Sequence, residues 1–215
     1  MPTRVKICGI TRLEDAQLAI ELGASTLGFN FFPSSPRYIA PTEARKIVDQ
    51  LPPLVVAVGV FANERDAKLV AAVARQAGVS VVQLHGLWFP SPLSSLARFR
   101  LIRAVAVAPD SRFDHLRNGK ASAYLLDTFH SKLFGGTGRK FDWKRAAEAK
   151  RYGPVILAGG LNAKNVGNAI RIARPFAVDV ASGVELVPGK KDPAKLRAFF
   201  AAVAKADRYR DEVSE

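Results

Sequence analysis

Eight short apolar runs follow one another along this chain of 215 residues, and helix-like stretches separate them. This alternation restricts the fold more than any other feature of the sequence. Most of the runs are rich in β-branched residues and are apolar on both faces, which is typical of parallel strands covered by helices. We expect strands at 4–10, 26–32, 55–61, 81–86, 101–107, 123–129, 154–160 and 177–183.

The stretches between the runs predict helices at 13–22, 42–51, 64–78, 142–153, 162–173 and 192–206, with weaker signals at 92–99 and 110–119. Gly23 should end the first helix, and Thr42 should cap the second. Eight strand–helix units predict an α/β fold of the (β/α)8, or TIM barrel, type. We expect one catalytic domain over 1–215, with a frayed tail from about residue 207. An open doubly wound sheet is the alternative, but no GxGxxG follows the first strand.

The composition limits the compartment and the partners. Cys8 is the single cysteine, which excludes an intramolecular disulfide and a multi-cysteine metal site and suits a reducing cytoplasm. We find no signal peptide and no apolar run of membrane-helix length, so we expect a cytoplasmic protein without a membrane partner. The net charge of +13 raises the question of nucleic-acid binding, but the excess is dispersed along the chain. A positive field also favours small anionic substrates.

In a (β/α)8 barrel the active site lies at the carboxyl ends of the strands. This rule selects Cys8, Arg37 in the loop after the second strand, His85, Asp127 and Asp179. Each also has a plain structural interpretation: a buried cysteine is usually inert, and His85 and Arg37 could be a core histidine and a solvated charge. Asp127 is harder to explain in this way, because burying a carboxylate on an apolar strand is costly.

Glycines gather after the last three barrel strands. They are Gly135, Gly136 and Gly138, then Gly159 and Gly160, then Ser182 with Gly183. Glycine lets backbone N–H groups approach an anion closely, and the late loops of this fold often bind phosphate. We therefore expect a phosphate site here, with tight barrel turns as the alternative.

With these residues assembled, the sequence resembles the phosphoribosylanthranilate isomerases of tryptophan biosynthesis. The resemblance runs from residue 6 to residue 185. It is carried by "KICGIT", "LGFNFFPSSPRYI", "VGVF", "VQLHG", "LLD", "GGTGRKFDW", "LAGGLNAKNV" and "VDVASGVE".

The resemblance implies a single barrel without a metal or an organic cofactor, and an Amadori rearrangement of an aminoaldose phosphate to a ketose phosphate. On the matching positions, Cys8 would be the general base and Asp127 the general acid. Arg37 would hold the anthranilate carboxylate, and the late loops would hold the phosphate. The residue chemistry agrees, since Leu125 and Leu126 should raise the pKa of Asp127 and keep it partly protonated.

Neighbouring residues have supporting parts in this hypothesis. Lys6 precedes Cys8 by two residues and should share its strand face, where a cation would favour the thiolate. We expect Asp179 to tighten the phosphate loops by accepting hydrogen bonds from their N–H groups. His85 should line the mouth of the barrel near the sugar or the anthranilate.

Several alternatives stay open at this point. The barrel could also accept a second substrate, from histidine biosynthesis, or it could be a basic barrel that binds nucleic acid, although we expect no nucleic-acid partner. The chain departs from the resemblance after "VQLHG", where Leu87, Trp88 and Phe89 could cover the mouth or contact another subunit. We expect a monomer or a homodimer.

Overall fold

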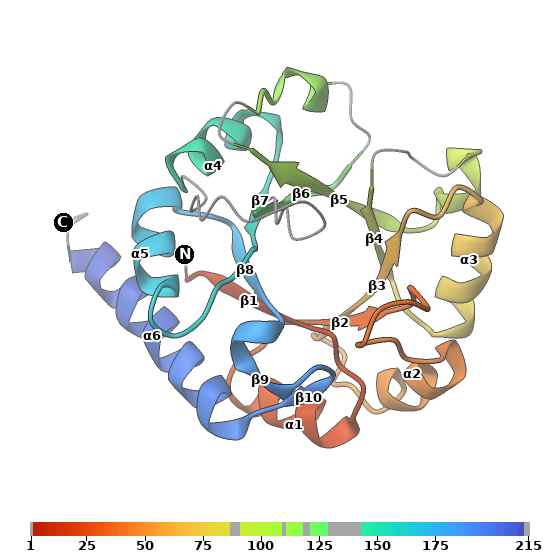
Figure 1. The fold of residues 1–215 in the computed structure, drawn as a ribbon, viewed down its shortest axis with the longest axis horizontal. Helices are drawn as coiled ribbons and strands as arrows, with labels where there is room; N and C mark the ends of the chain where they lie inside the picture. Colours follow the sequence, from red (N-terminus) through yellow and green to blue (C-terminus); the bar gives the residue numbers. More distant parts are fainter. Residues whose placement is uncertain (1, 87–90, 109–110, 118–120, 129–142, 213–215) are drawn as a thin grey trace.

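The computed structural model describes residues 2–86, 91–108, 111–117, 121–128 and 143–212. Eight parallel strands form a closed barrel in the order β1-β2-β3-β4-β5-β6-β7-β8, with β8 hydrogen-bonded to β1 (Figure 1). The strands are β1 (Arg4–Cys8), β2 (Thr26–Asn30), β3 (Val56–Ala62), β4 (Val81–His85), β5 (Arg100–Val107), β6 (Ala123–Thr128), β7 (Val155–Leu157) and β8 (Ala177–Val180). This confirms the predicted (β/α)8 barrel.

Helices surround the barrel on the outside. They are α1 (Leu13–Glu21), α2 (Pro41–Val48), α3 (Ala67–Gln76), α4 (Trp143–Ala149), α5 (Val166–Ala173) and α6 (Pro193–Glu212), with 3-10 turns η1 (Leu93–Leu96), η2 (Asp114–Leu116), η4 (Lys150–Tyr152) and η5 (Ser182–Val184). The weak signals at 92–99 and 110–119 thus contain η1 and η2 and no α-helix in the described residues.

Local chemistry sets the ends of several elements. Gly23, with φ +105°, follows α1 as expected. Thr42 does not cap α2, because the helix begins at Pro41 and Ala40 is the cap residue. Proline suits the first helical position, since its φ is already helical and its missing N–H would have no partner there. Strand β7 ends at Leu157, before Gly159 and Gly160, which both have positive φ.

Two apolar layers hold the molecule together. The larger layer lies between the barrel and the helices, and Tyr124, Phe29 and Phe199 are among its fully buried members. The smaller layer fills the barrel and consists of Val58, Val60, Val81, Ile102, Ala104, Ala123, Leu125, Ile156, Ala158 and Ala177, with Cys8 packed against it. Successive residues of a strand point to opposite faces, so each strand supplies both layers.

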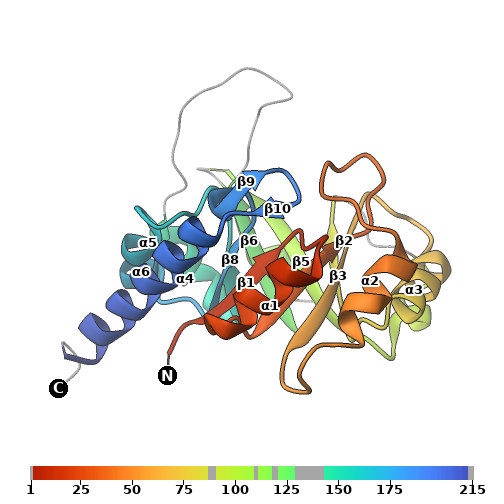
Figure 2. The same ribbon diagram turned by 90° about the horizontal axis from the view of Figure 1, so that it is seen from below.

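A short hairpin, β9 (Glu185–Val187) and β10 (Lys190–Lys191), follows η5. Figure 2 shows it on the side of the barrel away from the N terminus, which is the side where the barrel strands end. Helix α6 continues through Glu212, past residue 207 where a frayed tail was expected, and Asp207 accepts hydrogen bonds from the backbone N–H and the hydroxyl of Thr3.

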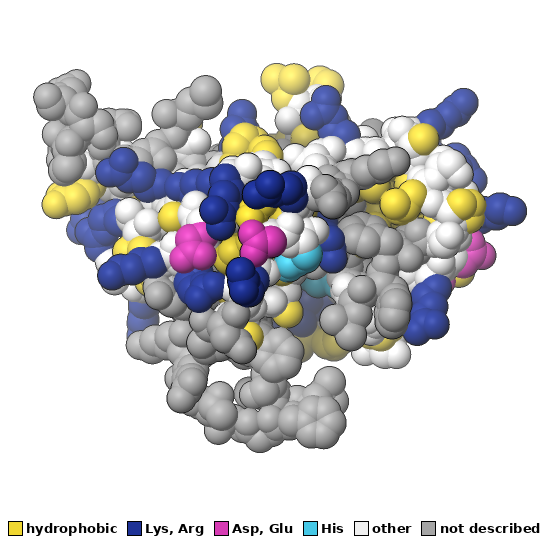
Figure 3. Space-filling model, turned by 90° about the horizontal axis from the view of Figure 1, so that it is seen from above, with side chains coloured by type: hydrophobic (Ala, Val, Ile, Leu, Met, Phe, Trp, Pro, Cys, Tyr) yellow, Lys and Arg dark blue, Asp and Glu magenta, His cyan; other side chains and the backbone are white. Residues whose placement is uncertain are grey.

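On the face drawn in Figure 3, Lys and Arg side chains gather around acidic side chains left of the centre, and others lie apart toward the top and right edges. No helix in the described parts of the chain has both the length and the apolar composition needed to cross a membrane.

Candidate active site

Polar side chains point into the barrel at its carboxyl end. Cys8 contacts the apolar layer inside the barrel, and Leu125 belongs to the same layer. Asp127 follows Leu125 by two residues, so it faces the interior at the end of β6. His85 ends β4, and Asp179 lies within β8. The barrel therefore places these four predicted site residues around one opening, although they are far apart in the sequence.

Lys6 and Asp179 form an ion pair inside the barrel, with Lys6 Nζ 2.9 Å from Asp179 Oδ1. The two residues are paired in the register between β1 and β8, and both are buried. Asp179 was expected to accept hydrogen bonds from loop N–H groups, but it accepts one from Lys6, because its strand position points it inward. Lys6 also lies near Cys8, and its charge lowers the pKa of the thiol, as the shared strand face predicts.

Gly28 of β2 provides the space for this arrangement. An ideal Cβ at Gly28 would lie 2.9 Å from Cys8 Sγ and 3.0 Å from Lys6 Nζ. Contacts below 3 Å are too close for a side chain, so any larger residue would displace the thiol or the ammonium. Sequence reasoning did not single out Gly28, since nothing in "TLGFNFF" marks which face of the strand it occupies.

The surroundings of Cys8 act on its pKa in opposite directions. Burial raises the pKa of the thiol, Lys6 and Lys191 lower it, and Asp179 raises it, with a net rise. Burial alone would lower the pKa of Lys6, but Asp179 and Cys8 raise it above its ordinary value, so Lys6 stays charged. The cation that the sequence predicted beside Cys8 is present, but a carboxylate partly offsets it.

His85 lies beside Gln83 of the same strand, with its Nε2 within hydrogen-bond distance of Gln83 Nε2. Burial and the nearby Lys6 lower the pKa of His85 to about 4, so its ring is neutral at pH 7. A neutral imidazole here can accept or donate a hydrogen bond without adding charge to the site.

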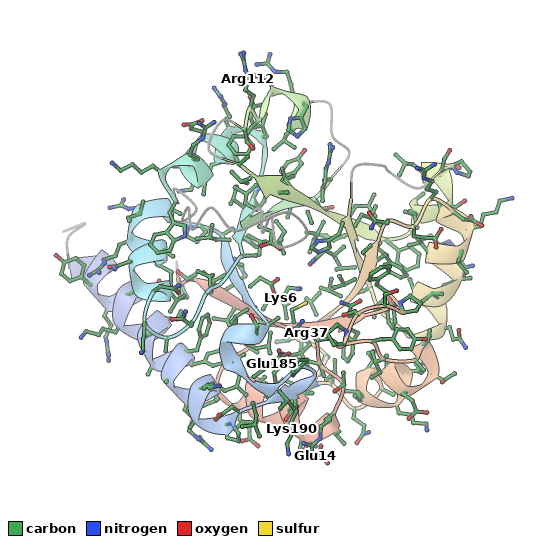
Figure 4. The ribbon with its side chains drawn as sticks, in the orientation of Figure 1. Lys6, Glu14, Arg37, Arg112, Glu185 and Lys190 are labelled. Carbon is green, nitrogen blue, oxygen red and sulfur yellow. The ribbon has the colours of Figure 1, made fainter. Side chains whose placement is uncertain are left out.

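Arg37 comes from the loop that follows β2, and Figure 4 shows it next to Glu185 of β9. Its Nη2 lies 2.7 Å from Glu185 Oε2, and its Nε donates to both carboxylate oxygens. Lys191 Nζ lies 2.9 Å from Glu185 Oε1. Burial raises the pKa of Glu185, but hydrogen bonds from Arg37 and Lys191 lower it to a value below the ordinary one. Sequence reasoning missed Glu185 and Lys191.

The loops after β7 and β8 lie against each other. An ideal Cβ at Gly183 would be only 1.9 Å from the carbonyl oxygen of Leu161, so only glycine fits there. The carbonyl of Gly160 accepts hydrogen bonds from the side chains of Asn162 and Asn165, which brace the first of the two loops. Gly183 therefore lies against the segment that directly follows Gly160, which brings the two glycine loops together.

Other predicted residues lie outside the described part of the chain. These are Gly135, Gly136 and Gly138, together with Leu87, Trp88 and Phe89. Across the described residues, no group of three or more His, Cys, Asp or Glu side chains is placed to hold a metal ion.

Comparison with known proteins connects this geometry to a family. The family model for N-(5'-phosphoribosyl)anthranilate isomerase matches residues 5–202. The chain belongs to this family. A curated relative from Citrifermentans bemidjiense, named N-(5'-phosphoribosyl)anthranilate isomerase, is 48% identical over 203 residues, which cover 94% of this chain and 98% of the relative.

Solved structures of phosphoribosylanthranilate isomerases have the same fold. The enzyme from Thermus thermophilus is 40% identical with a TM-score of 0.84, and the match covers 94% of this chain and 99% of that one. Another, with 40% identity, a TM-score of 0.81 and the same coverage, is a complex with reduced 1-(o-carboxyphenylamino)-1-deoxyribulose 5-phosphate. The family membership makes this chain an isomerase of tryptophan biosynthesis, as the resemblance implied.

Proposed function

We propose that the chain catalyses the Amadori rearrangement of N-(5-phosphoribosyl)anthranilate to 1-(2-carboxyphenylamino)-1-deoxyribulose 5-phosphate, with Asp127 as general acid and Cys8 as general base. The observation that carries this proposal is the inward placement of Cys8 and Asp127 at the carboxyl ends of β1 and β6. These strands are not neighbours in the barrel, so a sugar ring can lie between the two groups. Membership of the family supports the choice of substrate.

The first step needs an acid. Protonation of the furanose ring oxygen by Asp127 breaks the bond between that oxygen and C1, while the anilino nitrogen lone pair forms the C1=N iminium. Asp127 must therefore carry a proton when the substrate binds. Leu125, which is fully buried inside the barrel, lies on the same strand face as Asp127 and makes the interior below it apolar.

The second step needs a base. The iminium acidifies the proton on C2, and the Cys8 thiolate removes it, leaving an enolamine. Return of a proton to C1 and loss of the proton from the C2 hydroxyl complete the ketose, so no atom or electron is gained or lost overall. The charge of Lys6 lowers the pKa of Cys8 and increases the thiolate fraction.

The two anionic ends of the substrate need separate cationic or N–H-rich sites. Arg37, beside β9, would bind the anthranilate carboxylate, since a guanidinium matches a carboxylate in shape and charge. The loop containing Gly159 and Gly160 and the loop containing Ser182 and Gly183 would bind the phosphate. His85, neutral at pH 7, would contact the sugar or the aromatic ring.

Turnover of N-(5-phosphoribosyl)anthranilate by the purified protein tests the proposal directly, since the fluorescence of the substrate falls as it reacts. We expect turnover without added metal and in the presence of a chelator. Cys8→Ala and Asp127→Asn should each lower kcat by at least about 10²-fold if these groups transfer the protons.

A surface carboxylate provides the matched control. Asp49→Asn changes an exposed residue that pairs with Arg45 on α2, and it should leave kcat unchanged. A near-normal kcat in Cys8→Ala or Asp127→Asn would remove that residue from the mechanism. No turnover by the unmodified protein would refute the proposed function.

A further inference from the structure

Glu185 is the centre of a buried cluster with Arg37 and Lys191, which we call the Glu185 cluster. The side chain of Glu185 is 4% exposed, and that of Lys191 is fully buried. Glu185 Oε1 accepts from Lys191 Nζ at 2.9 Å and from the backbone N–H of Gly189 at 3.3 Å. A buried carboxylate with this many donors has a fixed position, because any rotation would leave charged groups without partners.

The carboxylate holds one edge of the Arg37 guanidinium. Within the described residues, all hydrogen bonds of this guanidinium go to Glu185, through Nε and Nη2. The two N–H groups of Nη1 and the second N–H of Nη2 form the other edge, and the Arg37 side chain is 23% exposed. A guanidinium has five N–H donors in a rigid plane, so fixing one edge also fixes the direction of the other.

The same cluster is tied to the strand that carries Cys8. Lys191 Nζ donates a hydrogen bond to the backbone carbonyl of Cys8. The stem of Arg37 lies on Gly9, where an ideal Cβ would come within 2.6 Å of Arg37 Cδ. The position of the guanidinium is thus set relative to the thiol by contacts on two sides.

The charge of the cluster leaves room for an anion. Two cations, Arg37 and Lys191, face one carboxylate, so the cluster has a net charge of +1. Lys191 is buried, but the Arg37 side chain is 23% exposed, so an anion from the solvent can reach the excess charge at Arg37. A substrate carboxylate at the free edge of Arg37 would neutralise it.

We propose that Glu185 is the positioning residue for the substrate's aromatic carboxylate: it holds Arg37 by the Nε/Nη2 edge and presents the other edge to the ligand, while Lys191 holds Glu185. This inference rests on the proposed function. Glu185 acts by ordering Arg37 before the substrate binds, so the substrate does not have to immobilise a flexible side chain.

The direction in which Glu185→Gln changes the affinity for an anionic ligand separates this role from a general charge effect. Glu185→Gln makes the cluster more positive, so a charge effect alone would tighten binding of an anion. If Arg37 is no longer held in place by Glu185, binding of the anion should instead weaken. The expected loss is roughly three- to tenfold, the cost of immobilising one side chain on binding.

The experiment uses two ligands and calorimetry on the full chain. One ligand is reduced 1-(o-carboxyphenylamino)-1-deoxyribulose 5-phosphate, and the other is the same molecule without the carboxylate. We expect Glu185→Gln to weaken the first by roughly three- to tenfold and to leave the second within about twofold. In turnover, KM should rise while kcat stays within about twofold. Glu43→Gln, on the exposed side of α2, is the matched control and should change neither affinity.

A second pair of variants tests the route of the effect. Once Arg37→Met has removed the guanidinium, adding Glu185→Gln should cause no further loss for the carboxylate ligand. If Glu185→Gln does not fold, Glu185→Asp keeps the charge beside Lys191 and shortens the reach to Arg37, and it should show the same selective loss.

Each outcome has one meaning. Equal losses for both ligands, tighter binding of the carboxylate ligand, or a further loss in the Arg37→Met background would overturn the role of Glu185 and leave the proposed function standing. If the unmodified protein binds neither ligand and does not turn over the substrate, the proposed function fails and this inference fails with it.

Discussion

Replacing Lys6 by methionine removes the positive charge beside the thiol of Cys8 while keeping a side chain of similar length. Lys6 is buried in the barrel near Cys8 and Asp179, and its ammonium donates a hydrogen bond to Asp179. The proposed mechanism needs a thiolate, and Lys6 lowers the pKa that burial and Asp179 raise. The substitution should therefore raise the pKa of Cys8.

The size of this rise follows from the geometry at Gly28. The thiol sulfur and the Lys6 nitrogen both lie within 3.0 Å of the ideal Gly28 Cβ position. They are therefore no more than about 6 Å apart, and with an effective dielectric constant of about 20 their attraction is about 3 kcal/mol, which corresponds to a pKa change of about 2. We expect the pKa of Cys8 to rise by about 1–2.

The pKa of Cys8 can be measured without interference from other thiols, because Cys8 is the single cysteine of the chain. The ultraviolet absorbance of the thiolate and the rate of alkylation by iodoacetamide, each followed against pH, report this thiol alone. In turnover, the acidic limb of kcat/KM should move to higher pH by the same amount, because the base must be deprotonated. At a fixed pH below that limb, kcat/KM should fall about tenfold if the pKa of Cys8 rises by about 1.

Two further variants fix the sign of the effect. Lys6→Arg keeps the charge and should leave the pKa of Cys8 close to that of the unmodified protein. Asp179→Asn removes a group that raises this pKa and should lower it. Losing one member of a buried ion pair costs about 3–5 kcal/mol, so the melting temperature of each variant must be measured as well. An unchanged or lower thiol pKa in folded Lys6→Met would refute the reasoning.

Three further predictions concern packing and pH. Gly28→Ala should lower kcat by roughly 10–100-fold, because a misplacement of about 1 Å can cost that much; an unchanged kcat would show that the thiol tolerates the methyl group. Gly183→Ala should destabilise the fold by about 1–3 kcal/mol through overpacking and should raise KM. At Gly160 an added Cβ would meet no atom within 4 Å, so Gly160→Ala should lower the free energy of unfolding only by the backbone strain of about 1–2 kcal/mol. Equal KM changes in Gly183→Ala and Gly160→Ala would contradict this reasoning. For His85, the pKa of about 4 lies below the ordinary 6.5, so the unfolded chain binds the proton more readily. The free energy of unfolding should then fall by about 3 kcal/mol as the pH drops from about 6.5 to about 4, and His85→Asn should remove that part of the fall in denaturant titrations.

Much of the fold, and the position of the proposed acid and base, could be predicted from local patterns. A strand or a helix shows its period within a few residues, so the barrel followed from the order of the units. Cys8 and Asp127 followed from the rule that barrel sites lie where strands end, and the two-residue period placed Lys6 on the face of Cys8. These conclusions need only near neighbours in the chain.

The partners of those residues depended on the tertiary structure. Lys6 and Asp179 are 173 positions apart, Arg37 and Glu185 are 148 apart, and Lys191 is 183 positions from Cys8. These contacts arise from the register with which β8 closes on β1 and from the fold of the β9–β10 hairpin over that junction.

The sequence by itself therefore determined the barrel and the residues at its mouth, while only the tertiary structure decided which charges meet there. The physical reason is that periodicity indicates which face of a strand a side chain occupies, but it carries no information on the register between distant strands. The register alone decides whether Asp179 opposes a loop N–H or the ammonium of Lys6, and whether Gly28 leaves space beside the thiol.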